Sequence, residues 1–113
     1  MRFITKTVEY NEVYRFHQRI SGKYFNLLMH FSESEESIGI GIVVRAKVGK
    51  AVVRNKIKRR IKGFLHQNKS LLPTGRKVII LVKNEAAAIS WSELCQDLRE
   101  SFQKMQSNGA EKQ

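Results

Sequence analysis

The sequence predicts a single α+β domain in which helices pack on an open sheet of three or four strands, in the order α-β-β-α-β-α. Two observations predict this class. Segments with helical apolar spacing are interspersed with segments of strand-like spacing. The 113 residues are also enough for one hydrophobic core but not for two. We therefore assign 1–106 to one domain and expect the polar tail, 107–113, to be disordered.

The first third of the chain is predicted to be an irregular arm followed by a helix. Residues 1–8 show no clear period. From about Glu9 to Arg19, apolar and aromatic residues recur at i, i+3, i+4 and i+7, which is the spacing of one helix face. These residues are Tyr10, Val13, Tyr14 and His17. An aromatic stripe of this kind fits either a core or a ligand surface, and the hydroxyls of Tyr10 and Tyr14 favour a partly wet position.

Two strands are expected next, and we interpret them as a hairpin. The segment 23–31 alternates large apolar residues, and 38–45 alternates Ile or Val with smaller residues. A polar turn, 32–37, separates the two. Gly39 and Gly41 leave one face of the second strand bare, so that a helix or a ligand can approach it closely.

The second half of the chain is predicted to be helix, strand and helix. A basic helix runs to about Asn68 and is followed by a loop with the only proline, Pro73. The continuous apolar run 77–82 predicts a central strand covered on both faces. Ser90 and Glu93 have the spacing of a capping box that begins the last helix. The buried stripe expected for that helix is Trp91, Leu94, Cys95, Leu98, Phe102 and Met105.

The charge of the chain indicates a polyanionic partner. Lys and Arg number 21 against 10 Asp and Glu, which gives a net charge of +11. Between Ser37 and Asn84 there are thirteen Lys or Arg residues and no acidic residue. Nucleic acid and an anionic membrane surface both suit this balance, but no stretch approaches eighteen apolar residues, so we expect no membrane association. The single cysteine, Cys95, favours a reducing cytoplasm.

The strongest signal is the segment 47–65, in which eight of nineteen residues are Lys or Arg and none is acidic. Its apolar residues share one helix face, so the cations occupy the other. Like charges four residues apart destabilise a helix, and no Ser, Thr, Asp or Asn caps its start. The free N–H groups around Gly49 and Lys50 therefore form a candidate phosphate site. A solvated basic face is the ordinary alternative, but the missing acids favour binding.

This segment also carries a family resemblance. Its signature residues are Gly49, Ala51, Val52, Arg54, Asn55, Ile57, Lys58 and Arg59, with Lys62 behind them. The pattern resembles the signature of the bacterial ribonuclease P protein subunit. The resemblance extends to the order of elements from about Tyr10 to Met105. It implies a left-handed β-α-β crossover around the basic helix, against the general right-handed rule.

The resemblance implies a role in tRNA processing as part of a ribonucleoprotein nuclease. In the family, an RNA subunit hydrolyses the phosphodiester bond between the 5′ leader and the tRNA, using Mg²⁺. The protein binds this RNA and the single-stranded leader of precursor tRNA. We therefore expect a monomeric, cytoplasmic RNA-binding subunit that is inactive alone and takes no small-molecule substrate.

The site residues follow from the resemblance position by position. The expected RNA-binding set is Lys47, Lys50, Arg54, Asn55, Lys56, Lys58, Arg59 and Lys62. The expected leader cleft is Tyr10, Tyr14, Phe25 and Leu28. The family often has an aromatic residue near Leu28, so the chain departs from the pattern there. Whether Tyr10 and Tyr14 face the leader or the core stays open at this point.

Nothing in the sequence indicates a protein-based catalytic centre. The acidic residues avoid the basic segment, and the three histidines lie on different predicted elements. No His or Cys spacing matches a zinc site. We expect no catalytic residue and no metal or cofactor on the protein, with Mg²⁺ at the RNA active site. The main alternative is a ribosomal or other structural nucleic-acid-binding protein with no role in cleavage.

Overall fold

The computed structural model describes residues 1–112, and side chains up to residue 106. Its five strands in this range are β1 (Arg2–Phe3), β2 (Gln18–Ser21), β3 (Phe25–Phe31), β4 (Ile38–Val43) and β5 (Arg76–Val82). The three α-helices of the same range are α1 (Thr7–Arg15), α2 (Ala51–Gln67) and α3 (Trp91–Lys112). Short 3₁₀ turns follow β4, α2 and β5. The sequence predicts that residues 107–113 are disordered, whereas the described backbone continues as α3 through residue 112, and residue 113 lies outside the described residues.

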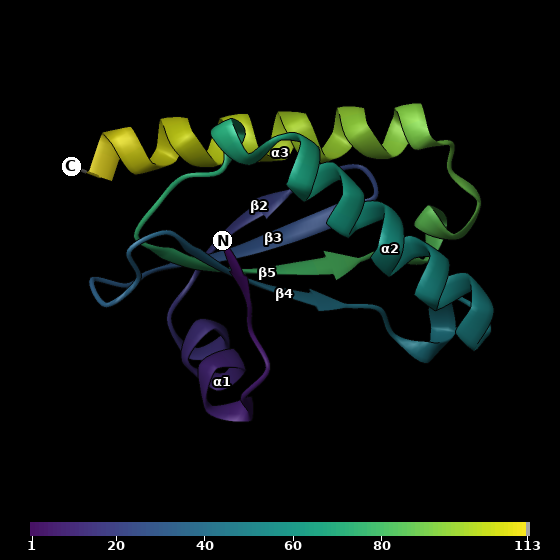
Figure 1. Cartoon of the computed structure of the whole chain (residues 1–113), viewed down its shortest axis with the longest axis horizontal. Helices are drawn as coiled ribbons and strands as arrows, with labels where there is room; N and C mark the ends of the chain where they lie inside the picture. The colour runs from purple at the N-terminus through teal and green to yellow at the C-terminus, as the bar shows by residue number, and fades with distance from the viewer. Residues whose placement is uncertain (113) are drawn as a thin grey trace.

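The strands form one mixed sheet in the order β1-β4-β5-β3-β2. β4 and β5 are parallel neighbours joined by α2, as expected from a strand on either side of a helix. The pairs β3–β5 and β2–β3 are antiparallel, while β1 is parallel to β4. Figure 1 shows α2 and α3 together on one face of the sheet and α1 on the other. The left-handed sense of the crossover stays an expectation from the resemblance.

Two predictions about the first third of the chain are wrong. Arg2 and Phe3 are a strand at the sheet edge, not an irregular arm. The first helix ends at Arg15 instead of Arg19, and residues 18–21 pair with β3. Apolar residues four apart, such as Phe16 and Ile20, fit either a helix or a strand. The pairing with β3 decides the matter because it buries Ile20 in the main core.

The predicted hairpin is also wrong, because β5 lies between β3 and β4. The sheet accordingly has five strands, not three or four. The continuous apolar character of β5 explains its place. All but one of its residues are buried, which requires a neighbour on each side and helices on both faces. The prediction that this strand is central is therefore confirmed.

The main core lies between the sheet and the two long helices. α2 contributes Ile57, Ile61, Phe64 and Leu65, all buried. The capping box of α3 is confirmed, since Ser90 Oγ accepts from the N–H of Glu93, at 3.1 Å, and Glu93 Oε1 accepts from the N–H of Ser90. The expected stripe of α3 is buried except at its start. Trp91 is 39% exposed and Cys95 half-buried, whereas Leu94 between them is buried in the main core.

Candidate nucleic-acid interface

The buried face of α2 determines which of its side chains meet solvent. Its four core residues lie on the side of the sheet and α3, so the remaining positions project outward. We call the predicted RNA-binding set, Lys47, Lys50, Arg54, Asn55, Lys56, Lys58, Arg59 and Lys62, the α2 ridge. Six of these residues are exposed, while Arg54 and Lys58 are half-buried. Among the side chains of residues 1–106, no ridge cation forms an ion pair.

The start of α2 has the electrostatic character of an anion site. Lys50 occupies the N-cap position with extended backbone, and no side chain caps the helix there. Arg54 folds back so that its Nε donates to the carbonyl oxygen of Gly49, at 3.1 Å. The positive end of the helix dipole and the guanidinium of Arg54 therefore lie together. A phosphate placed there would accept from the open N–H groups of the first turn.

A groove joins the α2 ridge to α1. It is lined by Phe3, Ile4, Thr5, Tyr10, Ile40, Ile42, Lys58 and Lys62. Lys62 Nζ lies 5.1 Å from the centre of the Phe3 ring, a cation–π contact that holds the ammonium beside the groove. The fold thus brings Tyr10 from the first helix next to two ridge lysines that are far away in sequence.

Tyr10 packs closely on the bare strand face that the glycines of β4 predict. A Cβ atom added at Gly41 would lie 2.6 Å from a carbon of the Tyr10 ring, so this contact requires glycine. The Tyr10 hydroxyl donates to the carbonyl oxygen of Ile4, at 3.3 Å, and burial raises its pKa. Tyr14 differs, because it is 43% exposed. Of the two tyrosines, Tyr14 therefore offers the more accessible ring.

A second hollow lies on the same face of the sheet, beyond the part that α1 covers. Three residues in register on adjacent strands line it, namely Val43, Leu81 and Asn26. The other lining residues are Arg19, Arg45, Lys47, Val82, Lys83, Asn84 and Glu85. We call this the sheet hollow. It holds about 400 Å³, and its four cations face a single acidic side chain within the described residues.

Sequence reasoning missed the sheet hollow, although two signals were present. Arg45 and Lys83 follow closely after β4 and β5, and the carboxyl ends of parallel strands meet at the same edge of a sheet. Asn26 alternates with the core residues Phe25 and Leu27, so it must lie on the opposite face of β3. The prediction used Phe25 and Leu28 of that strand and did not consider Asn26.

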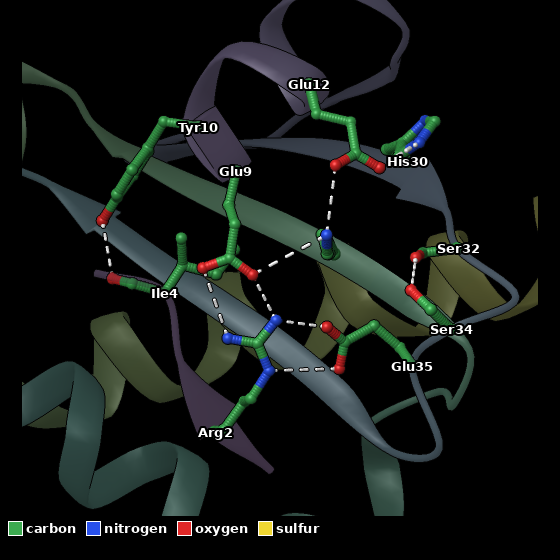
Figure 2. A network of polar contacts seen from close by, with 10 residues as sticks. Arg2, Ile4, Glu9, Tyr10, Glu12, His30, Ser32, Ser34 and Glu35 are labelled. Carbon is green, nitrogen blue, oxygen red and sulfur yellow. Dashed lines mark hydrogen bonds and ion pairs between the residues drawn. The ribbon is translucent and has the colours of Figure 1, made fainter. Parts of the chain in front are cut away.

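An ion-pair network fixes α1 and β1 to the sheet, as Figure 2 shows. The Arg2 guanidinium lies between the carboxylates of Glu9 and Glu35. Lys77 Nζ contacts Glu12, at 3.1 Å, and Glu9, at 3.7 Å. The hydrogen bond from Arg2 lowers the pKa of Glu9, and the hydrogen bond from Lys77 lowers that of Glu12. The charges of these carboxylates are therefore neutralised by neighbouring cations, so they do not repel an anionic ligand.

The comparisons with known proteins agree with this architecture. The family model "Ribonuclease P" matches residues 2–106. A "Ribonuclease P protein component" from Mycoplasma capricolum is 37% identical over 95 residues, covering 82% of this chain and 85% of that protein. The chain belongs to the ribonuclease P protein family. Its members are the protein component of ribonuclease P, which works with an RNA subunit in tRNA 5′ processing. This membership decides against the ribosomal alternative.

Solved structures of ribonuclease P proteins share the fold. The Staphylococcus aureus protein has a TM-score of 0.84 at 22% identity, covering 91% of this chain and 94% of that chain. The Thermotoga maritima protein has a TM-score of 0.79 at 21% identity, covering 85% and 90%. None of the helices that the structure describes is long and apolar enough to cross a membrane.

Two residues expected in the leader cleft of this ribonuclease P protein are not on an open surface. Phe25 is fully buried in the main core, on the face of the sheet that α2 and α3 cover. Leu28 is on the α1 face but is only 3% exposed, because it packs beneath Val13 and against Ile79. The period of two along a strand already places positions 25 and 28 on opposite faces. The prediction that Phe25 lines the cleft is therefore wrong, and Leu28 supports α1 from below.

Proposed function

We propose that this chain contacts the RNA subunit of ribonuclease P through the α2 ridge and guides the unpaired 5′ leader of precursor tRNA across the α1 face of the sheet. One observation carries the proposal. The seven cations of the ridge have no carboxylate partner among residues 1–106, so their charge is available to an external polyanion. Phosphate contacts from such a surface position RNA without reading its sequence.

The α1 face supports the leader half of the proposal. The exposed ring of Tyr14 offers a flat surface to a base, and stacking on aromatic rings is worth roughly 1–3 kcal/mol per base in single-stranded RNA. The groove beside Lys58 and Lys62 and the sheet hollow beside Arg45 and Lys83 both combine apolar floors with cationic rims. An unpaired strand, which has free bases and phosphates, matches this combination better than a duplex does.

The proposal places the chemistry on the RNA subunit. The Mg²⁺ ions that assist hydrolysis are held there, and the protein acts as a cytoplasmic monomer that improves binding of precursor tRNA. On the protein, the carboxylates nearest to Tyr10 are engaged by Arg2 and Lys77. Glu9, Glu12 and Glu35 therefore keep α1 in place, and we assign them no role in cleavage.

Reconstitution with a bacterial ribonuclease P RNA tests the proposal. We expect the purified protein alone to leave precursor tRNA intact, and we expect the protein to lower the Kd of the RNA subunit for leader-bearing substrate. Mature tRNA serves as the matched ligand without a leader. Cleavage at the mature 5′ end by protein alone, surviving stringent removal of contaminants, would contradict the proposal. So would equal effects of the protein on the Kd values of leader-bearing and mature tRNA.

A further inference from the structure

A further hollow lies between the C-terminal half of α2 and the first turns of α3, the two helices that share one face of the sheet (Figure 1). We call it the Trp91 hollow. It holds about 550 Å³, and within the described residues it shares no lining residue with the groove beside α1 or with the sheet hollow. Its lining residues are Gln67, Asn68, Trp91, Ser92, Cys95, Gln96 and Arg99.

The Trp91 ring is a large apolar group that the fold leaves partly open. It is 39% exposed and is not part of the main core. Its edge lies over Gly63 of α2, where an added Cβ would be 3.6 Å from Cη2 of the ring, an ordinary van der Waals distance. Alanine would therefore fit at this position, and glycine inside a helix costs stability relative to alanine. The packing does not require this glycine, whereas close approach of an outside group to α2 does.

The charges around Trp91 favour an anionic partner. Among the described residues that line the hollow, Arg99 is the only charged one, and it forms no ion pair within residues 1–106. The acidic residues of this part of α3 line a different pocket, where Glu93 accepts from the Tyr24 hydroxyl, at 2.8 Å. Burial raises the pKa of Cys95, so its thiol stays neutral. The hollow therefore combines a flat aromatic ring with an available cation.

The Trp91 hollow also continues the α2 ridge along the helix. Gly63 follows Arg59 by four residues and Lys56 by seven. Residues at these spacings are neighbours on one side of a helix. Lys58 instead lines the groove beside α1, on the other flank of α2. An RNA that lies along the ridge therefore reaches the hollow on the flank away from that groove.

We propose that one unpaired base of the RNA subunit stacks on Trp91, with its phosphate beside Arg99. The inference rests on the proposed function, because it extends the contact with the RNA subunit from the α2 ridge to the Trp91 hollow. A base within a duplex is covered by its neighbours, so only an unpaired base offers a free face to the ring. The exposed amide of Gln67 can donate to or accept from the edge of such a base.

Trp91 is its own reporter, because no other tryptophan occurs in the chain. The first experiment titrates a bacterial ribonuclease P RNA into the protein and records the emission of Trp91 and its quenching by acrylamide. We expect the complex to have lower emission, since a stacked base quenches indole, and a smaller acrylamide quenching constant, since one face of the ring is covered. Unchanged emission and acrylamide access would overturn the proposal and leave the ring open to a protein partner.

The second experiment measures the Kd of protein variants for the same RNA. Trp91→Leu keeps apolar volume but lacks a flat ring, and it should raise the Kd at least about fivefold, the lower limit for loss of one stacked base. Trp91→Phe keeps a ring and should raise the Kd less. An unchanged Kd in Trp91→Leu, or equal rises in both variants, would contradict stacking.

Arg99→Gln tests the phosphate contact and has a matched control in Lys23→Gln. Lys23 is also exposed, but it lies over the Tyr24 ring in the pocket with the acidic residues of α3. Arg99→Gln should flatten the slope of log K against log[salt] by about 0.7, as one contact with a single strand predicts, and Lys23→Gln should not. Equal slopes in the two variants would overturn the placement of the phosphate.

Gly63→Ala separates binding from folding. It should raise the denaturation midpoint, because alanine favours the helix, and it should also raise the Kd, because its methyl group lies where the RNA approaches α2. A lower midpoint or an unchanged Kd would overturn the close approach.

The same measurements keep the two proposals apart. If Arg59→Ala leaves binding of the RNA subunit unchanged, the proposed contact through the α2 ridge fails, and the inference built on it fails too. If Arg59→Ala weakens binding while Trp91→Leu and the emission of Trp91 show no effect, only the Trp91 hollow is excluded from the interface.

Discussion

Arg59 and Arg60 are neighbours on α2, but the structure gives them different tasks. Arg59 is exposed and forms no hydrogen bond or ion pair with the described side chains. Arg60 is half-buried, and its Nη1 donates to the carbonyl oxygen of Ile89, at 3.0 Å. We therefore expect Arg59→Ala to weaken binding of the RNA subunit without unfolding the protein. Arg60→Ala should instead lower stability, by about 1 kcal/mol for one hydrogen bond.

The magnitude for Arg59 follows from counterion release. If the seven ridge cations neutralise about six phosphates, the slope of log K against log[salt] for RNA-subunit binding is near −5, at roughly 0.9 per phosphate. Loss of one contact then flattens the slope by about 0.9. Counterion release no longer contributes to binding at about 1 M salt. Extrapolated from there to about 0.15 M, a slope smaller by about 0.9 corresponds to about fivefold weaker binding.

The assay is a salt titration of complex formation with each variant, combined with denaturant unfolding of the free protein. We expect Arg59→Ala to change the slope and keep the unfolding midpoint, and we expect the reverse for Arg60→Ala. An unchanged slope for Arg59→Ala would remove this side chain from the interface. Equal flattening by both variants would show that the division between the exposed and the half-buried arginine is mistaken.

Three further predictions concern the α1 face. Tyr14→Ala should raise the Kd of the holoenzyme for leader-bearing precursor tRNA and leave the Kd for mature tRNA unchanged, because roughly 1–3 kcal/mol of base stacking is lost. An equal rise in both Kd values would show that Tyr14 has a structural role. Gly41→Ala should destabilise the protein by roughly 1–3 kcal/mol through its clash with the Tyr10 ring, and adding Tyr10→Ala should recover part of this loss in denaturant unfolding. The hydrogen bond from Lys77 holds the folded-state pKa of Glu12 below its ordinary value of 4.5, so the unfolded state binds more protons. The contribution of Glu12 to stability is therefore present above about pH 4.5 and is lost as the pH falls through the folded-state pKa. Glu12→Gln should reduce the fall of the unfolding free energy between neutral and acidic pH, whereas Glu33→Gln, at an exposed position, serves as the control. An unchanged pH dependence in Glu12→Gln would refute the role of the ion pair with Lys77.

The α2 ridge and the capping box of α3 could be predicted because each depends on residues that are close in sequence. Helical spacing determines which side of α2 is apolar, and therefore where Arg59 and Lys62 project. The Ser90–Glu93 pair needs only the local geometry of a helix start. The burial of β5 could also be predicted from its own composition, since an uninterrupted apolar run requires cover on both faces.

The strand order, the identity of β1 and β2, and the sheet hollow were decided by tertiary structure. Gln18–Ser21 becomes a strand because β3 is beside it, and β3 is separated from β4 because β5 arrives from far along the chain. Alternation alone puts Asn26 on the face opposite Phe25, but its environment depends on Leu81 and Val43, which other strands supply. Local periodicity determines the direction in which a side chain points, whereas long-range pairing determines what it meets.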